Sequence, residues 1–79
     1  MSISQRLREV RDRDYGGEQK IMAADWAIHE SKLSRWITSE RIPTHNSYDF
    51  LAGKLGISIA EVHESCQIER RERELATTT

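Results

Sequence analysis

The stretch QKIMAADWAIHESKLSRWITSERIP, residues 19–43, decides the fold of this chain. It predicts a short helix, a tight turn and a second short helix that packs against the first. Two such helices cross closely only where a small side chain lies at their contact, and Ala23 occupies that position. Large apolar residues then anchor the second helix from beneath: Ile28, Leu33 and Trp36.

The turn between these two helices falls on Ala27. Backbone geometry at such a turn favours glycine, because a left-handed conformation brings Cβ close to the following carbonyl oxygen. We therefore expect Ala27 to cost about 1 kcal/mol if its backbone is left-handed. The second helix is predicted at about residues 30–38 and stops before Pro43.

Another helix is predicted before this pair. Apolar side chains recur at helical spacing in residues 3–10, and either Ser2 or Ser4 is expected to cap the helix. The glycine pair at positions 16–17 breaks the pattern. The next helix, which is the first of the central pair, is expected at about residues 18–25.

Two further helices are predicted after the central pair. Residues 48–55 place apolar side chains at positions i, i+3, i+4 and i+7, with Thr44 as the expected cap and Gly56 just past the end. Ser58 and Glu61 have the spacing of a capping box, in which each side chain bonds to the backbone N–H of the other residue. A fifth helix is therefore expected to start there.

These five short helices predict one all-α domain over residues 1–66. Residues 67–79 are expected to form a charged helical extension that ends in a disordered tail at residues 77–79. A chain of 79 residues has room for one domain with a small core.

Composition argues against several classes of protein. The chain is 37% hydrophobic and 32% charged, and no apolar run approaches the roughly 20 residues that cross a bilayer. The first residues lack a secretory signal and Cys66 is the single cysteine, so we expect a cytoplasmic protein. No nucleophile–base pair or phosphate-cradling loop is present, and the three histidines lack paired metal-ligand spacing. We therefore expect no enzyme activity, cofactor, metal or small-molecule ligand.

The net charge of −1 gives little support to nucleic-acid binding, because lysine and arginine supply most of the non-specific affinity for phosphate. The charge is unevenly distributed. Residues 1–45 hold eight basic and seven acidic side chains, a balance of +1, whereas the remainder holds four and six, a balance of −2. A nucleic-acid hypothesis must therefore rest on the pattern of residues.

That pattern joins the central pair of helices to the one that follows. Its positions are Gln19, Ala23, Ile28, Leu33, Trp36, Pro43, Leu51-Ala52 and Leu55-Gly56-Ile57-Ser58. Over residues 5–63 the chain thereby resembles the lambda-repressor/Cro-like, or Xre-type, helix-turn-helix family. The resemblance implies a five-helix lambda-repressor-like fold whose third helix lies in the major groove of DNA. It also implies a sequence-specific transcription regulator, from a phage or prophage, that binds operator DNA as a homodimer.

The resemblance also implies which residues bind DNA. Base contacts fall near the start of the third helix, at His29, Glu30, Ser31, Lys32 and Arg35. Gln19 matches the family glutamine that binds a phosphate at the start of the second helix. The further phosphate contacts that we expect are Ser39, Arg41 and Thr44. The apolar surface for a second copy is expected from Ile59, Val62, Cys66 and Ile68.

The chain departs from the family pattern in two further places. Arg11 matches an arginine of the first helix, but Ile37 replaces the glutamate with which that arginine pairs. The expected partner of Arg11 is therefore Asp14 or a phosphate. The connection at residues 15–17 is one residue longer than usual, which affects the expected orientation of the second helix.

Other functions remain open. A Cro-like repressor is the leading interpretation. Residues 34–36 followed by residues 42–43 are similar to the CII activators of lambdoid phages, so a CII-like activator is the alternative. A protein-interaction module, such as an antitoxin or an anti-repressor partner, is a further alternative that the near-neutral charge favours. Salt dependence distinguishes it from a DNA-binding protein, since phosphate contacts weaken steeply as salt rises.

Overall fold

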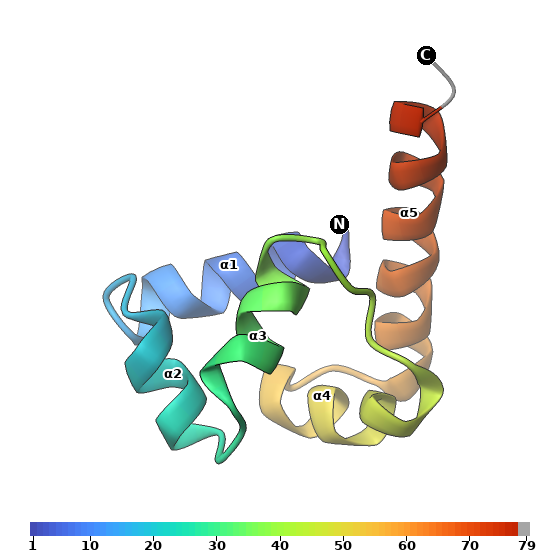
Figure 1. The fold of residues 1–79 in the computed structure, drawn as a ribbon. Coiled ribbons are helices and arrows are strands. Elements are labelled where there is room, and N and C mark those ends of the chain that lie inside the picture. The colour runs from blue at the N-terminus through green and yellow to red at the C-terminus, as the bar shows by residue number, and fades with distance from the viewer. Residues whose placement is uncertain (78–79) are drawn as a thin grey trace.

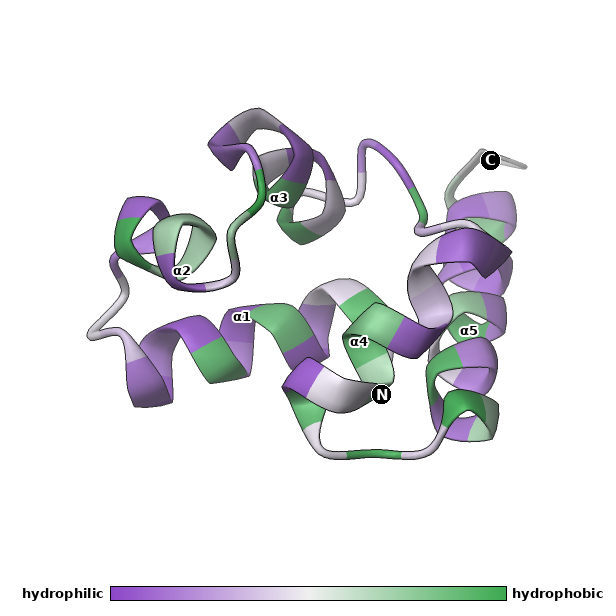
Figure 2. Ribbon diagram, turned by 90° about the horizontal axis from the view of Figure 1, so that it is seen from below, coloured by the Kyte–Doolittle hydropathy of each residue, from purple (hydrophilic) through white to green (hydrophobic). Residues whose placement is uncertain are grey.

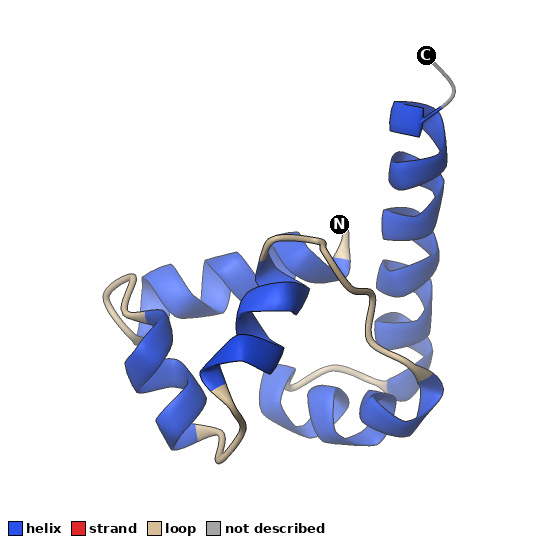
Figure 3. Cartoon of the chain, in the orientation of Figure 1, coloured by secondary structure: helices blue, strands red, loops and turns tan. Residues whose placement is uncertain are grey.

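The computed structural model describes residues 1–77, and helices are the only regular secondary structure in that range (Figure 1). The helices are α1 (Ile3–Asp14), α2 (Gln19–Asp25), α3 (Glu30–Ile37), α4 (Tyr48–Leu55) and α5 (Ile59–Thr77), and the short 3-10 turn η1 (His45–Ser47) precedes α4. Figure 3 shows the same chain as helices joined by short loops. The predicted all-α class with five helices is confirmed. None of the described helices is long and apolar enough to cross a membrane.

Several helix ends lie where the sequence predicts them. The Oγ of Ser2, and not that of Ser4, accepts a hydrogen bond from a backbone N–H in the first turn of α1, at 3.3 Å. Gly56 ends α4 with a left-handed φ of 68°. The capping box forms: the N–H of Glu61 donates to the Oγ of Ser58 at 3.1 Å, and the N–H of Ser58 donates to the carboxylate of Glu61 at 3.2 Å.

Thr44 does not cap α4, contrary to the prediction. The chain first makes η1, in which the N–H of Ser47 donates to the backbone carbonyl of Thr44 at 2.9 Å, and no side chain caps either η1 or α4 within the described residues. α4 therefore begins at Tyr48, and Thr44 stays exposed.

α5 includes the predicted helical extension, but it is more closely packed than expected. It continues to Thr77, so this residue belongs to the helix rather than to the predicted tail, and residues 78–79 lie outside the described residues. Glu69 belongs to the predicted charged extension, yet it is only 2% exposed. Its Oε1 accepts a hydrogen bond from the N–H of Ser4 at 3.2 Å, where the positive end of α1 favours a carboxylate. α5 therefore packs against α1 as far as Glu69.

The core lies where the helices meet. Figure 2 shows α3 on one side of α1 and α4. The predicted anchors Leu33 and Trp36 are buried, and Ile28 is half-buried against the core. The buried apolar side chains are Ile3, Leu7, Val10, Met22, Ala23, Trp26, Leu33, Trp36, Ile37, Tyr48, Leu51, Ala52, Val62 and Cys66.

The turn between α2 and α3 has the left-handed residue that the sequence suggested. Ala27 has a φ of 56°. Its N–H donates to the carbonyl of Ala24 at 3.2 Å, and the N–H of Ile28 donates to the carbonyl of Ala23 at 3.1 Å. This pair of bonds is a Schellman motif, which satisfies the last carbonyls of α2 and sets the angle at which the chain enters α3.

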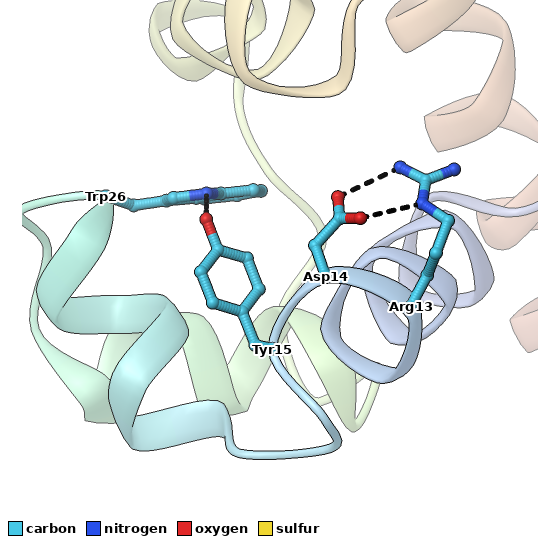
Figure 4. A network of polar contacts seen from close by, with 4 residues as sticks. All are labelled: Arg13, Asp14, Tyr15 and Trp26. Carbon is cyan, nitrogen blue, oxygen red and sulfur yellow. Dashed lines mark hydrogen bonds and ion pairs between the residues drawn. The ribbon is translucent and has the colours of Figure 1, made fainter.

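Tyr15 closes the connection between α1 and α2 (Figure 4). Its hydroxyl accepts a hydrogen bond from the Nε1 of Trp26 at 3.1 Å and donates one to the carboxylate of Asp25. The polar atom of the buried Trp26 is thereby satisfied, and the end of α2 is held against the end of α1. The hydrogen bond to Asp25 raises the pKa of Tyr15.

Two arginines of α1 pair with the acidic residues that follow them. The Nε of Arg11 lies 3.0 Å from Oδ1 of Asp12, and the Nε of Arg13 lies 3.0 Å from Oδ1 of Asp14 (Figure 4 draws the second pair). The proposed pairing of Arg11 with Asp14 is therefore not formed, because Arg13 engages Asp14. Exposed pairs of this kind contribute little to stability.

Replacing Ala27 with glycine should stabilise the protein. Glycine has no Cβ to clash at a positive φ, so we expect the free energy of unfolding in urea to rise by about 0.5–1 kcal/mol. Ala24→Gly is the matched control, because Ala24 is an exposed residue inside α2, where glycine should cost about 0.5–1 kcal/mol. Equal losses in the two variants would contradict a strained turn.

Tyr15→Phe should lower the free energy of unfolding by about 1 kcal/mol at neutral pH, because the Nε1 of Trp26 loses its acceptor. The raised pKa of Tyr15 means that the folded state retains the phenol proton. The contribution of this hydroxyl to the free energy of unfolding is therefore complete below pH about 10 and is lost as the pH rises further. Between pH 7 and pH 11, the denaturation midpoint of Tyr15→Phe should fall less than that of the wild type. Identical profiles would contradict this role of the hydroxyl.

Candidate nucleic-acid interface

α3 has one buried and one exposed side. Leu33, Trp36 and Ile37 are 0%, 5% and 3% exposed, and their spacing places them on the side that faces the core. The five side chains predicted to contact bases are all exposed: His29, Glu30, Ser31, Lys32 and Arg35. The exposed side of α3, from its cap residue to its last turn, is therefore open to a partner.

A groove with a volume of about 400 Å³ lies beside these residues. It is lined by α3 and by the connection to α4, through His29, Ser31, Lys32, Arg35, Trp36, Arg41, Thr44 and Ser47. Six of the nine residues predicted to contact DNA thus meet in one concave surface. The other three, Glu30, Gln19 and Ser39, lie outside its lining.

The groove is cationic. Its lining includes Lys32, Arg35 and Arg41, and no carboxylate side chain is among the lining residues. An apolar wall, here Trp36, lowers the local dielectric constant and strengthens the positive potential inside a concave surface. We call this surface the basic groove. The whole chain has a net charge of −1, but this local surface is positive.

Trp36 connects the core to the basic groove. The Nζ of Lys32 lies 5.3 Å from the centroid of the Trp36 ring. A cation–π contact of this kind contributes about 0.5–1 kcal/mol at an exposed site. The two residues are four positions apart and so are neighbours on the helix surface, where the buried and exposed sides meet. The tryptophan therefore anchors α3 and also orders the lysine at the groove.

The four predicted phosphate contacts fall into two groups. Arg41 and Thr44 are exposed and line the basic groove. Gln19, the first residue of α2, and Ser39, which follows α3 with a φ of 63°, are half-buried outside it. The N–H of Arg41 donates to the carbonyl of Arg35 at 3.0 Å, which turns the connection back along α3.

A contact that the sequence did not reveal holds the far end of α3. The Nη1 of Arg8 donates to the backbone carbonyl of Ile37 at 3.0 Å. The resemblance implies an ion pair between Arg11 and a glutamate at position 37, but this chain has Ile37 there. The bond from Arg8 links α1 to the end of α3 in its place. The sequence gives little indication of this bond, because its acceptor is a backbone carbonyl rather than a side chain. The only general signal is that a cation is favoured at the end of a helix.

The surface predicted for a second copy is only partly available. Val62 and Cys66 are both 0% exposed, so they belong to the core of this chain and cannot form a free surface. They lie four positions apart on the side of α5 that packs against α4, and burial raises the pKa of the Cys66 thiol. Ile59 is 49% exposed and Ile68 is half-buried. These two residues remain as candidate apolar contacts.

Comparisons with protein-family models, with curated proteins and with solved structures find no match to this chain. The role of the basic groove is therefore inferred from its residues. A function must explain three properties of this surface. Most of its side chains are exposed, its charged residues Lys32, Arg35 and Arg41 are all positive, and α3 is attached to the core by its buried side.

Proposed function

We propose that this chain is a sequence-specific DNA-binding transcription regulator with a lambda-repressor-like helix-turn-helix fold. The observation that supports this proposal most directly is the basic groove, in which three cationic side chains and the exposed start of α3 lie together with no carboxylate in the lining. A helix attached by one side to a small core and exposed on the other has the shape that enters the major groove of duplex DNA.

The exposed residues of α3 have side chains that suit base edges. Arg35 and Lys32 donate to O6 and N7 of guanine, the commonest specific contact in protein–DNA complexes. Glu30 accepts from N4 of cytosine, and it lies outside the groove lining, where its charge opposes phosphate binding least. Ser31 serves either a base or a phosphate, and His29, at the cap position of α3, completes the set.

Phosphate contacts fix the protein on the duplex. Arg41 and Thr44 face the same groove as the base-contacting residues and are placed to bind the backbone on one flank of α3. Gln19 and Ser39 lie at the start of α2 and just past the end of α3. In this arrangement the phosphates set the register of α3, and its side chains supply the sequence preference.

A homodimer is the expected form, since one half-site is short and two-fold related half-sites lie one helical turn apart on the DNA. Both a Cro-like repressor and a CII-like activator, encoded by a phage or prophage, agree with the proposal. Selection of random duplexes by the purified protein distinguishes them, because inverted repeats indicate a repressor-like dimer and direct repeats indicate the CII-like form.

Arg35→Ala should lower affinity for the selected duplex by about 10- to 100-fold, because it removes a bidentate contact to guanine. The fold should be unchanged, as Arg35 is exposed, and circular dichroism checks this point. Arg71→Ala is the matched control: it removes the same charge from an exposed position on α5 and should change affinity by less than about threefold. Unchanged operator affinity in Arg35→Ala would count against the proposed role of α3.

Arg41→Gln should weaken binding to all duplexes alike and should reduce the slope of log affinity against log salt by about 1. The measurement is fluorescence anisotropy on the selected duplex and on a scrambled one between 50 and 200 mM salt, the range over which phosphate-driven affinity falls by about 10³–10⁵ for 6–10 contacts. A binding partner whose affinity is insensitive to salt would instead favour the protein-interaction module.

A further inference from the structure

A second cationic pocket lies beside the basic groove. It has a volume of about 280 Å³ and is lined by Ile42, Arg70, Arg73 and Glu74. We call it the α5 pocket, because three of these residues belong to α5. All three are exposed, and two arginines with one glutamate give the lining a balance of +1. The charged second half of α5, to which the proposed function gives no role, therefore presents a positive surface.

The α5 pocket and the basic groove lie on either side of the connection between α3 and α4. Arg41 and Thr44 line the basic groove, whereas Ile42, which follows Arg41 directly, lines the α5 pocket. Figure 1 shows this connection, in green, running from the end of α3 to the side of α5. It stays beside α5 as far as η1, where the ring centroids of His45 and His63 lie 6.4 Å apart. The two positive surfaces are therefore neighbours.

The arginines of the α5 pocket share one side of the helix. Arg70 and Arg73 are three positions apart, the spacing of neighbours on a helix surface. The charge of Arg70 also reaches Tyr48 of α4, where it opposes the rise in the pKa of the phenol that burial causes. This side of α5 therefore faces α4 and the connection rather than the opposite surface of the molecule.

We propose that the α5 pocket binds phosphates of the same duplex that α3 reads, so that α5 is a second DNA-binding element of this chain. This inference rests on the proposed function. Each DNA strand carries one phosphate for about every 3.4 Å of helix axis, so the strand that Arg41 contacts continues past the connection. Its next phosphates come to Arg70 and Arg73, whose planar guanidinium groups bind phosphate through paired hydrogen bonds.

Glu74 weakens this pocket for phosphate. Its carboxylate is the one negative group among the lining residues. A phosphate in the pocket shares that small volume with the carboxylate, and salt screens their repulsion only in part, because the Debye length is about 8 Å at physiological ionic strength. Removing the carboxylate should therefore strengthen DNA binding, whereas removing either arginine should weaken it.

The first test measures duplex affinity by fluorescence anisotropy between 50 and 200 mM salt. Arg70→Gln and Arg73→Gln should each reduce the slope of log affinity against log salt by about 0.9, so that affinity falls about 3.5-fold less over this range than in the wild type. Glu74→Gln should raise affinity at 100 mM salt by about two- to fourfold, as expected for one charge removed 5–8 Å from a phosphate in water.

Two neighbours on α5 are matched controls. Arg71→Gln and Glu72→Gln remove the same charges from exposed positions that do not line the pocket, because successive helical residues are rotated by about 100°. Neither should change affinity by more than about twofold. Circular dichroism and sedimentation should be unchanged in every variant, since all these side chains are exposed.

A second test identifies the ligand by duplex length. A duplex that ends at the last base pair required by α3 lacks the flanking phosphates, and an extension of about half a helical turn at each end supplies them. The wild type should gain at least about threefold in affinity from the extension. The double variant Arg70→Gln/Arg73→Gln should gain little.

The outcomes separate this inference from the proposed function. Unchanged salt slopes in Arg70→Gln and Arg73→Gln, with Arg41→Gln still affected, would overturn the inference and leave the proposed function standing. An equal gain from the extended duplex in the wild type and the double variant would also overturn it. Weaker binding together with altered sedimentation would assign the arginines to a contact between two copies instead. No duplex binding by the wild type would overturn both.

Discussion

The burial of one side of α3 is the constraint on which the rest of the molecule depends. A helix of eight residues is too short to be stable in water by itself, so its position must come from its contacts. Leu33, Trp36 and Ile37 supply these contacts, and Arg8 adds a hydrogen bond at the last turn. The core contacts of these three residues therefore fix the position of the whole helix, including the backbone of its exposed side.

Much of this arrangement follows from local patterns in the sequence. The all-α class, the capping box at Ser58 and the left-handed Ala27 each depend on residues within five positions of one another, and each is present in the structure. The exposure of the start of α3 follows from the same helical periodicity that buries Leu33. The chemistry of the basic groove was likewise predictable, since six of its lining residues were selected from the resemblance.

What the sequence did not predict depends on contacts between distant segments. Val62 and Cys66 have the spacing of an apolar surface, but whether that surface is free or buried depends on where α4 lies. The carboxylate of Glu69 bonds to Ser4, and no helical periodicity relates residues so far apart. The approach of His45 to His63 has the same cause, because it needs η1 and α5 to be adjacent.

The left-handed Ala27 has an evolutionary consequence. Most domains are stable by only about 5–15 kcal/mol, so a turn that is strained by about 1 kcal/mol is an appreciable fraction of the total. Alanine and glycine codons differ by one nucleotide, which makes relief of this strain readily accessible to mutation. The side chains at the start of α3 are exposed and can vary without disturbing the core. The exposed side of α3 can therefore change in sequence while a single substitution in the preceding turn compensates for stability lost elsewhere.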